Sequence, residues 1–365
     1  MYDSRRLEWC LPINVIVSTL AKLQGKTIAK CSLVSSTWLS ACRDPEIRRK
    51  LRIDRNWYTL GSTDCLEVDL EPSQSFAIII DKERVAVGGT IWLKVWDLVE
   101  GEWRKLYQDL PRSVKPSLAF TEGGWMIRGS HSGFINGWKD DVSFNFNEHQ
   151  GRLSAIVGVG RSMIASGGDS TGHIELWKLP IECIGESTTL SREAILEGHM
   201  TPVCCLTATE DDRYLISGAL DNTIRVWNVH TKTCEKELTH PVWLGKDCLH
   251  LSVHDDMLAT CCLGNYVLKV RLWRFQAPGS YCGKTFQAYM RGNAIRALWF
   301  HENRVVVGDR EGYICVFDVE SGECIKSLFL SPRRGYSLGV ISIWCSTEKL
   351  VVAGRGKIRI WNLDT

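Results

Sequence analysis

Residues 198–228 read GHMTPVCCLTATEDDRYLISGALDNTIRVWN. Three short apolar runs in this stretch are separated by polar turns, and the last run ends at Trp227. Runs of four to eight residues bounded by Gly, Asn and Asp are typical of antiparallel strands. Residues 234–238 supply a fourth run, so the stretch predicts one four-stranded sheet.

The same plan recurs along the chain, with an aromatic residue at a fixed phase. The aromatic residues are Trp96, Trp138, Trp177, Trp227, Trp273, Phe317 and Trp361, at spacings of 42, 39, 50, 46, 44 and 44 residues. A period near 40 residues is typical of units that bury their faces only by stacking on like neighbours. Seven such units can close into a ring that leaves only short edges. The sequence therefore predicts a mainly β, seven-bladed propeller.

The fourth of these units resembles a WD repeat, which carries Gly-His near its start and Trp-Asp at the end of its third strand. In that family a His, a turn Asp, a strand Ser or Thr and the Trp form a hydrogen-bonded group. The resemblance assigns these places to His199, Asp221, Ser217 and Trp227. We interpret the group as a device that specifies the fold, because a buried imidazole and indole need partners. We expect blade four alone to carry the full set.

The WD-repeat propeller is expected over residues 64–365, and its two ends should meet. The chain stops at Thr365, four residues after Trp361, which leaves no room for a fourth strand in the last blade. Residues 66–70 alternate apolar and acidic side chains with a period of two. We therefore expect residues 64–70 to form the outer strand of blade seven, which would remove an exposed edge.

Residues 8–53 show helical periodicity instead. Ile13, Ile16, Leu20 and Leu23 fall at steps of three, four and three, which places them on one helix face. Asp44-Pro45-Glu46 supplies the N-cap, first-turn proline and first-turn acid of a further helix. We therefore expect a small all-α module before the propeller.

This module resembles an F-box, on Leu11-Pro12 at its start, a series of apolar positions after it, and Val34 followed by Trp38. The resemblance implies docking onto the adaptor of an SCF-type, cullin-based ubiquitin ligase. The implied anchors are Leu11, Pro12, Ile16, Leu20, Val34 and Trp38. Short helices are marginal without packing, so the module needs a partner. The alternative is a helical cap on the propeller of a WD-repeat scaffold that has no link to a ligase.

The propeller would then bind a client protein. In each repeat, the turn between the second and third strands lies at the same end of the ring as the connection into the first strand. Six basic residues map to this end in blades six and seven: Arg291, Arg310, Arg333, Arg334, Arg355 and Lys357. Asp309 and Glu311 offset their charge only in part. We hypothesise that they bind an acidic or phosphorylated client segment; the alternative is a solvated rim.

Composition and motifs limit the other classes of function. The net charge is +2, which gives no general attraction for nucleic acid or a membrane surface. No apolar run reaches the roughly 18–20 residues of a membrane span. The chain has no G-x-S-x-G, P-loop or H-E-x-x-H motif, and its nine His residues lack metal-ligand spacing. We expect no catalytic residue, cofactor or metal; in an F-box receptor the ligase chemistry belongs to partner proteins.

Several strand residues receive a structural interpretation only. The 15 Cys residues form no C-x-x-C pair, which suits free, mostly buried thiols in a reducing compartment and hence a cytoplasmic or nuclear location. Cys204-Cys205 and Cys261-Cys262 are interpreted as strand neighbours that point to opposite faces. Arg225, Arg271 and Arg359 each stand two residues before a strand aromatic and are interpreted as ordinary exposed residues.

Overall fold

The computed structural model describes residues 17, 44–60, 65–69, 77–81, 83–108, 110–111, 113, 116–140, 142–147, 149, 151–168, 172–180, 190–239, 250–264, 267–276, 282–289, 294–330, 339–354 and 357–363. The six adaptor anchors implied by the F-box resemblance lie outside these residues. Among the six basic residues expected to bind the client, Arg310 and Lys357 are described.

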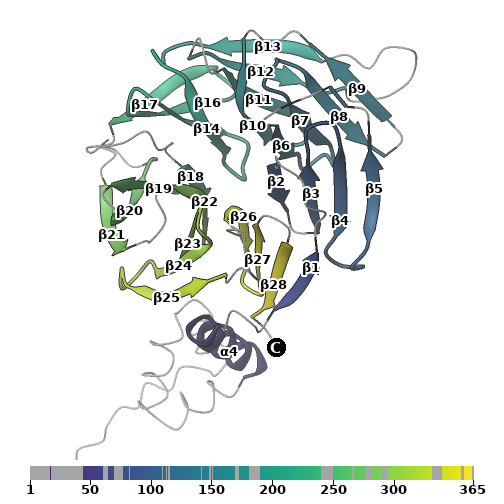
Figure 1. Ribbon diagram of the computed structural model, residues 1–365. Coiled ribbons are helices and arrows are strands. Elements are labelled where there is room, and N and C mark those ends of the chain that lie inside the picture. Colours follow the sequence, from purple (N-terminus) through teal and green to yellow (C-terminus); the bar gives the residue numbers. More distant parts are fainter. Residues whose placement is uncertain are drawn as a thin grey trace, which may run out of the picture.

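The described residues form seven antiparallel sheets of four strands, the blades, which are arranged in a ring (Figure 1). Blade one consists of β2 (Ala77–Ile80), β3 (Arg84–Gly88), β4 (Leu93–Asp97) and β5 (Trp103–Tyr107), and blade two of β6 (Ser117–Phe120), β7 (Met126–Gly129), β8 (Ile135–Lys139) and β9 (Val142–Phe146). Blade three consists of β10 (Leu153–Val159), β11 (Met163–Gly168), β12 (Ile174–Lys178) and β13 (Ser191–Leu196), and blade four of β14 (Val203–Ala208), β15 (Tyr214–Ala219), β16 (Thr223–Asn228) and β17 (Thr233–Thr239).

Blade five consists of β18 (His250–His254), β19 (Met257–Gly264), β20 (Val267–Arg274) and β21 (Cys282–Tyr289), and blade six of β22 (Ile295–His301), β23 (Arg304–Asp309), β24 (Tyr313–Asp318) and β25 (Cys324–Phe329). Blade seven consists of β26 (Val340–Cys345), β27 (Lys349–Gly354), β28 (Lys357–Asn362) and the outer strand β1 (Leu66–Asp69). The predicted seven-bladed propeller is therefore confirmed, and both adjacent Cys pairs lie in strands, as predicted.

The antiparallel order gives the ring two distinct ends. We call upper the end that carries the turns between second and third strands and the connections into first strands, and lower the opposite end. Backbone hydrogen bonds join turn and connection at the upper end: the Leu220 N–H donates to the Pro202 carbonyl at 3.1 Å, and the Arg310 N–H to the Ala294 carbonyl at 2.9 Å. Side chains from both kinds of loop therefore lie close together there.

Strand β1 closes the ring from the N-terminal side of the propeller. It pairs antiparallel with β28, with Glu67 opposite Arg359 and Asp69 opposite Lys357. Residues 66–69 thus hold the position that the sequence assigned to residues 64–70. Glu67 accepts a hydrogen bond from Arg359 Nε at 2.8 Å and also bonds Lys357, so the closing strand is matched to its neighbour in charge as well as in register.

Apolar side chains fill the junctions between neighbouring blades. A cluster of buried residues lies at each of the seven junctions in the described part of the ring. At the junction that closes the ring, Val85 and Val87 of blade one pack with Val351 and Ile358 of blade seven. Each such side chain contributes about 1.5–3 kcal/mol through burial, so stability comes from stacking of blades.

Helix α4 (Pro45–Thr59) begins where the sequence predicts. The Glu46 N–H donates to the Asp44 carboxylate at 2.9 Å, and Pro45 occupies the first turn. The helix continues past residue 53, where the helical module was expected to end. Its last turns place Trp57 and Leu60 in the buried cluster between blades six and seven, so α4 is packed on the ring (Figure 1).

Candidate functional site

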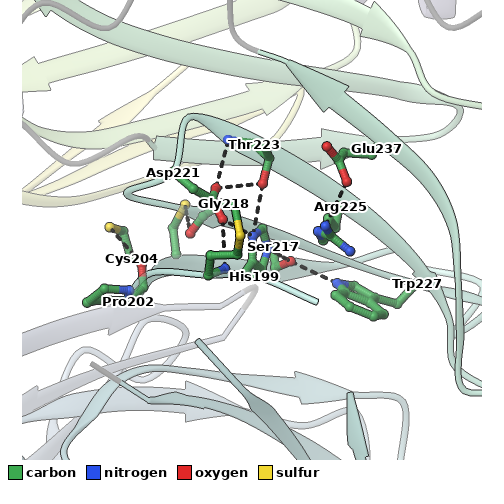
Figure 2. Close-up of polar contacts among 12 residues, drawn as sticks. His199, Pro202, Cys204, Ser217, Gly218, Asp221, Thr223, Arg225, Trp227 and Glu237 are labelled. Carbon is green, nitrogen blue, oxygen red and sulfur yellow. Dashed lines mark hydrogen bonds and ion pairs between the residues drawn. The ribbon is translucent and has the colours of Figure 1, made fainter. Parts of the chain in front are cut away.

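The best-defined polar group in the ring is the network of blade four (Figure 2). The Trp227 indole N–H donates to Ser217 Oγ at 2.8 Å, and Ser217 Oγ lies 2.7 Å from His199 Nε2. His199 Nδ1 lies 3.2 Å from an Asp221 carboxylate oxygen and 3.0 Å from Thr223 Oγ1. The four residues named by the WD-repeat resemblance thus form one chain of hydrogen bonds, which Thr223 extends.

The protonation state of His199 follows from its burial. Removal from water lowers the pKa of the imidazole below its usual value, although the neighbouring Asp221 carboxylate acts in the opposite direction. A neutral ring donates from Nδ1 to Asp221 and accepts the Ser217 hydroxyl proton at Nε2. Each polar atom of the group then has a partner inside the blade, which suits a structural role.

Blade three contains a related network, which the sequence did not predict, although it lacks the turn Asp of the full set. The Trp177 indole donates to Ser166 Oγ at 2.8 Å, and Ser166 Oγ lies 3.0 Å from His149 Nδ1. Glu175, from the third strand, lies 3.3 Å from the same nitrogen and takes the place of the turn Asp. The missed signal is spacing: His149 precedes Ser166 by 17 residues, and His199 precedes Ser217 by 18.

Blade two places an arginine where blades three and four have this serine. Arg128 pairs across the sheet with Asn136, as Ser217 pairs with Arg225. Its side chain is fully buried, and its guanidinium donates to the Thr90 carbonyl at 2.9 Å and the Pro111 carbonyl at 3.1 Å. Burial lowers the pKa of Arg128 to about 10. The guanidinium therefore ties a strand of blade two to the upper-end loops of blade one.

The interpretation of three strand arginines as ordinary exposed residues is also wrong. Arg271 and Arg359 are buried, and Arg225 is largely buried and pairs with Glu237 at 2.7 Å. They share the face of the third strand that bears the aromatic residue, and acids of the fourth strand lie opposite Arg225 and Arg359. Cross-strand charge pairing, which needs the register of the sheet, explains the burial of Arg225 and Arg359, whereas Arg271 lies opposite Thr285.

The predicted basic sector exposes less positive charge than the sequence indicates, because one of its two described residues is paired with acids. Arg310 is exposed at the upper end of blade six. Lys357 begins β28, also at the upper end, but its ammonium is paired with Glu67 and lies 3.4 Å from Asp69. Arg291, Arg333, Arg334 and Arg355 lie outside the described residues. Among these six residues, Arg310 is thus the described one whose side chain faces solvent.

The acid expected to offset this sector has a structural role. Asp309 is buried, and its carboxylate accepts the N–H groups of Glu311 at 2.9 Å and Tyr313 at 2.8 Å. This turn geometry is typical of an Asp that folds back onto the backbone two to four residues ahead. The Asp309 charge is therefore directed into the turn, away from the surface.

The upper end also carries exposed apolar residues, which the charge pattern of the sequence does not reveal. Met200 is 88% exposed, Tyr289 is 86% exposed and Leu220 is 42% exposed. Met200 and Leu220 lie close together on blade four, because the Met200 N–H donates to Asp221, the neighbour of Leu220, at 3.1 Å. Met200 and Leu220 therefore form a small exposed apolar pair at the upper end of blade four.

Helix α4 approaches the ring from the opposite end. Arg49 pairs with Glu348 in the turn between the first two strands of blade seven, and Asn56 Nδ2 donates to the Leu363 carbonyl at 2.8 Å, just beyond β28. Both partners lie at the lower end. The helix and the exposed upper-end residues are therefore separated by the height of the ring.

Among the residues that the structure describes, no group of three or more His, Cys, Asp or Glu side chains has a geometry that could hold a metal ion. No described helix is long and apolar enough to cross a membrane.

Comparison with known protein families gives two matches. Residues 9–50 match the F-box domain, and residues 190–228 match the WD domain, G-beta repeat. The second match covers the last strand of blade three and most of blade four, including the His199 network. The first match ends within α4.

Curated relatives are diverse WD proteins. The chain is 23% identical over 258 residues to a guanine nucleotide-binding protein subunit beta-like protein of Encephalitozoon cuniculi, a match that covers 64% of this chain and 66% of the relative. It is 29% identical to ribosome biogenesis protein YTM1 of Vanderwaltozyma polyspora, over 34% of this chain and 28% of the relative. It is 24% identical to B-type cell cycle switch protein ccs52B of Medicago truncatula, over 76% of this chain and 56% of the relative.

The matched regions thus span between about a quarter and two thirds of these relatives' own length. Their names describe different proteins and processes, so the similarity assigns no single process to this chain. The F-box match identifies a second region, which precedes the propeller. The chain thus combines a match to the F-box at residues 9–50 with a seven-bladed ring that contains a WD-repeat match, which is the combination found in F-box and WD-repeat proteins.

Proposed function

We propose that the chain is the client-binding subunit of an SCF-type ubiquitin ligase, in which the F-box region docks onto the adaptor and the propeller binds the client. The observation that carries the proposal is the position of α4. The F-box match ends at residue 50, inside a helix that is packed on the lower end of the ring through Trp57 and Leu60. One continuous helix thus links the two regions.

The proposed role is non-catalytic. Ubiquitin transfer depends on holding the client near the enzyme that carries ubiquitin, and a fixed helix limits the distances and angles that the two can adopt. The Arg49 and Asn56 contacts support this role, because they anchor α4 at two further points. The partners are then the ligase adaptor and, through it, the cullin. We place the protein in the cytoplasm or nucleus, where such ligases work.

The proposed client surface is the upper end of the ring. An acidic or phosphorylated client segment would pair with Arg310 and with Arg291, Arg333, Arg334 and Arg355, which the sequence assigns to the same sector. Exposed Met200 and Leu220 would add apolar contact on blade four. Lys357 contributes less to this surface than the sequence predicted, because its ammonium is paired with the closing strand.

The second candidate function is a WD-repeat scaffold without a ligase partner. The observation that favours it is the burial of Trp57 and Leu60 against the ring, because a helical cap would bury the same residues. The two functions differ in what residues 9–50 bind.

Capture of the full-length chain on purified adaptor tests the proposal. We expect binding by the wild type, loss of binding in the double variant Leu11→Ala/Pro12→Ala, and unchanged binding in the triple variant Arg310→Glu/Arg333→Glu/Arg355→Glu. In affinity purification, the triple variant should lose the client proteins that the wild type recovers. Absence of adaptor binding by a folded wild type would instead support the scaffold.

A further inference from the structure

Blade six contains a β-bulge at the upper end of its first strand. Ile295 of β22 pairs with Asp309 of β23, and Ala297 pairs with the adjacent Gly308, so Arg296 is an extra residue between them. A bulge changes the direction in which a side chain points, and bulges are frequent next to functional sites. The Arg296 side chain therefore departs from the regular alternation of the strand.

The packing of β22 shows where Arg296 points. Ile295 and Leu298 lie in the buried cluster between blades five and six, and Ala297 lies in the cluster between blades six and seven. Arg296 belongs to neither cluster and is exposed. The first strands of neighbouring blades contact one another all round the ring and form its inner wall (Figure 1). Since β22 is the inner edge strand of its sheet, Arg296 is directed toward the ring axis at the upper end.

The backbone that precedes Arg296 is fixed by two hydrogen bonds. The Arg310 N–H donates to the Ala294 carbonyl at 2.9 Å, and His250 Nε2 of blade five donates to the Ile295 carbonyl at 3.1 Å. The first bond joins the connection into β22 to the turn that carries Arg310, so both arginines belong to the upper end of blade six. Among the described residues, no carboxylate lies within ion-pair distance of Arg296. Its charge is therefore available to a ligand, on a backbone that is already in position.

Three other blades have the same bulge, but their extra residues carry no charge. Ser154 in blade three, Cys204 in blade four and Ile341 in blade seven are each half-buried. The Ser154 hydroxyl lies 2.5 Å from the Val203 carbonyl of the neighbouring blade, so it joins two blades. Among these four extra residues, Arg296 is the one that is exposed and charged. The bulge is therefore a recurrent feature of the ring, and its arginine distinguishes blade six.

We propose that Arg296 is a client-binding residue, which pairs with a carboxylate or phosphate of the client near the ring axis, with Arg310 in the adjacent turn as the second cation. This inference rests on the proposed function of the upper end as the client surface. A guanidinium donates two parallel N–H groups to such an anion, which fixes the orientation of the anion as well as its position. The acidic residue of the client then lies beside blade six at the ring axis, and the contact does not require Lys357, which is paired with the closing strand.

Binding of defined peptides to the full-length chain tests the proposal by fluorescence anisotropy. The probes are fluorescein-labelled octaglutamate and an alanine octapeptide with one phosphoserine, and octaglutamine is the neutral reference. We expect the wild type to bind at least one anionic probe more tightly than octaglutamine, and the preferred probe distinguishes carboxylate from phosphate. Arg296→Gln should weaken this binding about three- to tenfold. Arg296→Lys, which keeps the charge but loses the fork of N–H groups, should weaken it less.

The matched control is Arg274→Gln, which removes an exposed arginine at the lower end of blade five and should bind like the wild type. Because these side chains are exposed, all variants should melt within about 2 °C of the wild type. If Arg296→Gln binds the preferred probe normally while Arg310→Gln does not, the role of Arg296 is overturned and the upper-end client surface stands. If Arg274→Gln loses as much binding as Arg296→Gln, or the wild type prefers neither anionic probe, the anion-binding role is overturned, and capture on the adaptor still tests the ligase function separately.

Discussion

At one equivalent position of the second strand, different blades carry different polar side chains, and each side chain forms a different set of hydrogen bonds. Ser217 and Ser166 each join a histidine to a tryptophan, and in blade five Thr260 accepts the Trp273 indole at 3.0 Å. Arg128 replaces this group in blade two and reaches loop carbonyls directly. Each solution connects the strand to other parts of its blade or to the neighbouring loops, and the serine and threonine hydroxyls satisfy a buried indole N–H that would otherwise cost stability.

Replacement of Ser217 by Ala tests how much the blade-four network contributes to the free energy of unfolding. The change leaves the Trp227 indole N–H and the His199 ring nitrogen buried without the hydroxyl that joins them. We expect the free energy of unfolding, measured with urea, to fall by about 1–3 kcal/mol. Thr231→Ala, which removes an exposed hydroxyl of the same blade, is the control and should change it by less than about 0.5 kcal/mol. Equal stability of the two variants would contradict a role for the network.

The buried histidine also predicts a pH dependence of stability. Because the pKa of folded His199 lies below the unfolded value of about 6.5, the unfolded chain binds a proton that the folded chain excludes. Its contribution is therefore fully present above pH 6.5 and is lost as pH falls through the folded pKa. We expect the free energy of unfolding to decrease between pH 7 and pH 5, and less steeply in His199→Asn. The exposed His230→Asn should keep the wild-type slope; a common slope for all three proteins would exclude His199 as the cause.

Whole strands were more predictable from the sequence than the contacts between them. Alternation with a period of two and turn residues are local signals, so the position of the closing strand at residues 66–69 and the start of α4 at Pro45 could be read from short stretches. The burial of Arg359 could not, because it depends on Glu67, which is distant in sequence and reaches it only through the register of β1 on β28. His149 was missed because no Gly-His pair marks it.

The closing strand can be tested by charge reversal. Glu67→Lys places a third cation beside Lys357 and the largely buried Arg359, which loses its carboxylate partner. We expect a loss of about 1–3 kcal/mol in the free energy of unfolding and earlier cleavage by protease before residue 77. Leu66→Lys adds the same charge one residue earlier, on an exposed side chain, and should have little effect. If both variants unfold alike, the ion pairs do not hold the strand.

The molecule as a whole places α4 at one end of the ring and the proposed client surface at the other. The F-box region was identified in the sequence by its apolar pattern, but its attachment to the lower end of blades six and seven was not, because that contact joins residues that are far apart in the chain. The attachment makes the distance between the two ends a fixed property of the fold, provided that α4 stays packed.

Trp57 is the residue on which this packing depends most, since it is the largest α4 side chain in the cluster between blades six and seven. Replacing a buried Trp by Ala costs about 3–5 kcal/mol. We expect Trp57→Ala to release α4 from the ring, which hydrogen exchange would detect as faster exchange of α4 amides while strands β10 to β17 keep their protection. In a reconstituted ligase, adaptor binding should persist, and ubiquitin transfer to the client should fall several-fold because the two ends no longer keep a fixed separation.

The control for this variant is Arg48→Ala, on an exposed face of the same helix, which should change neither exchange nor transfer. Hydrogen exchange and ubiquitin transfer test different parts of this prediction. If α4 amides in Trp57→Ala exchange as slowly as in the wild type, the helix is held by Arg49 and Asn56 and the apolar contact is secondary. If exchange accelerates but transfer is unchanged, the ligase tolerates a loose link, and the fixed geometry of the molecule is not what sets the rate.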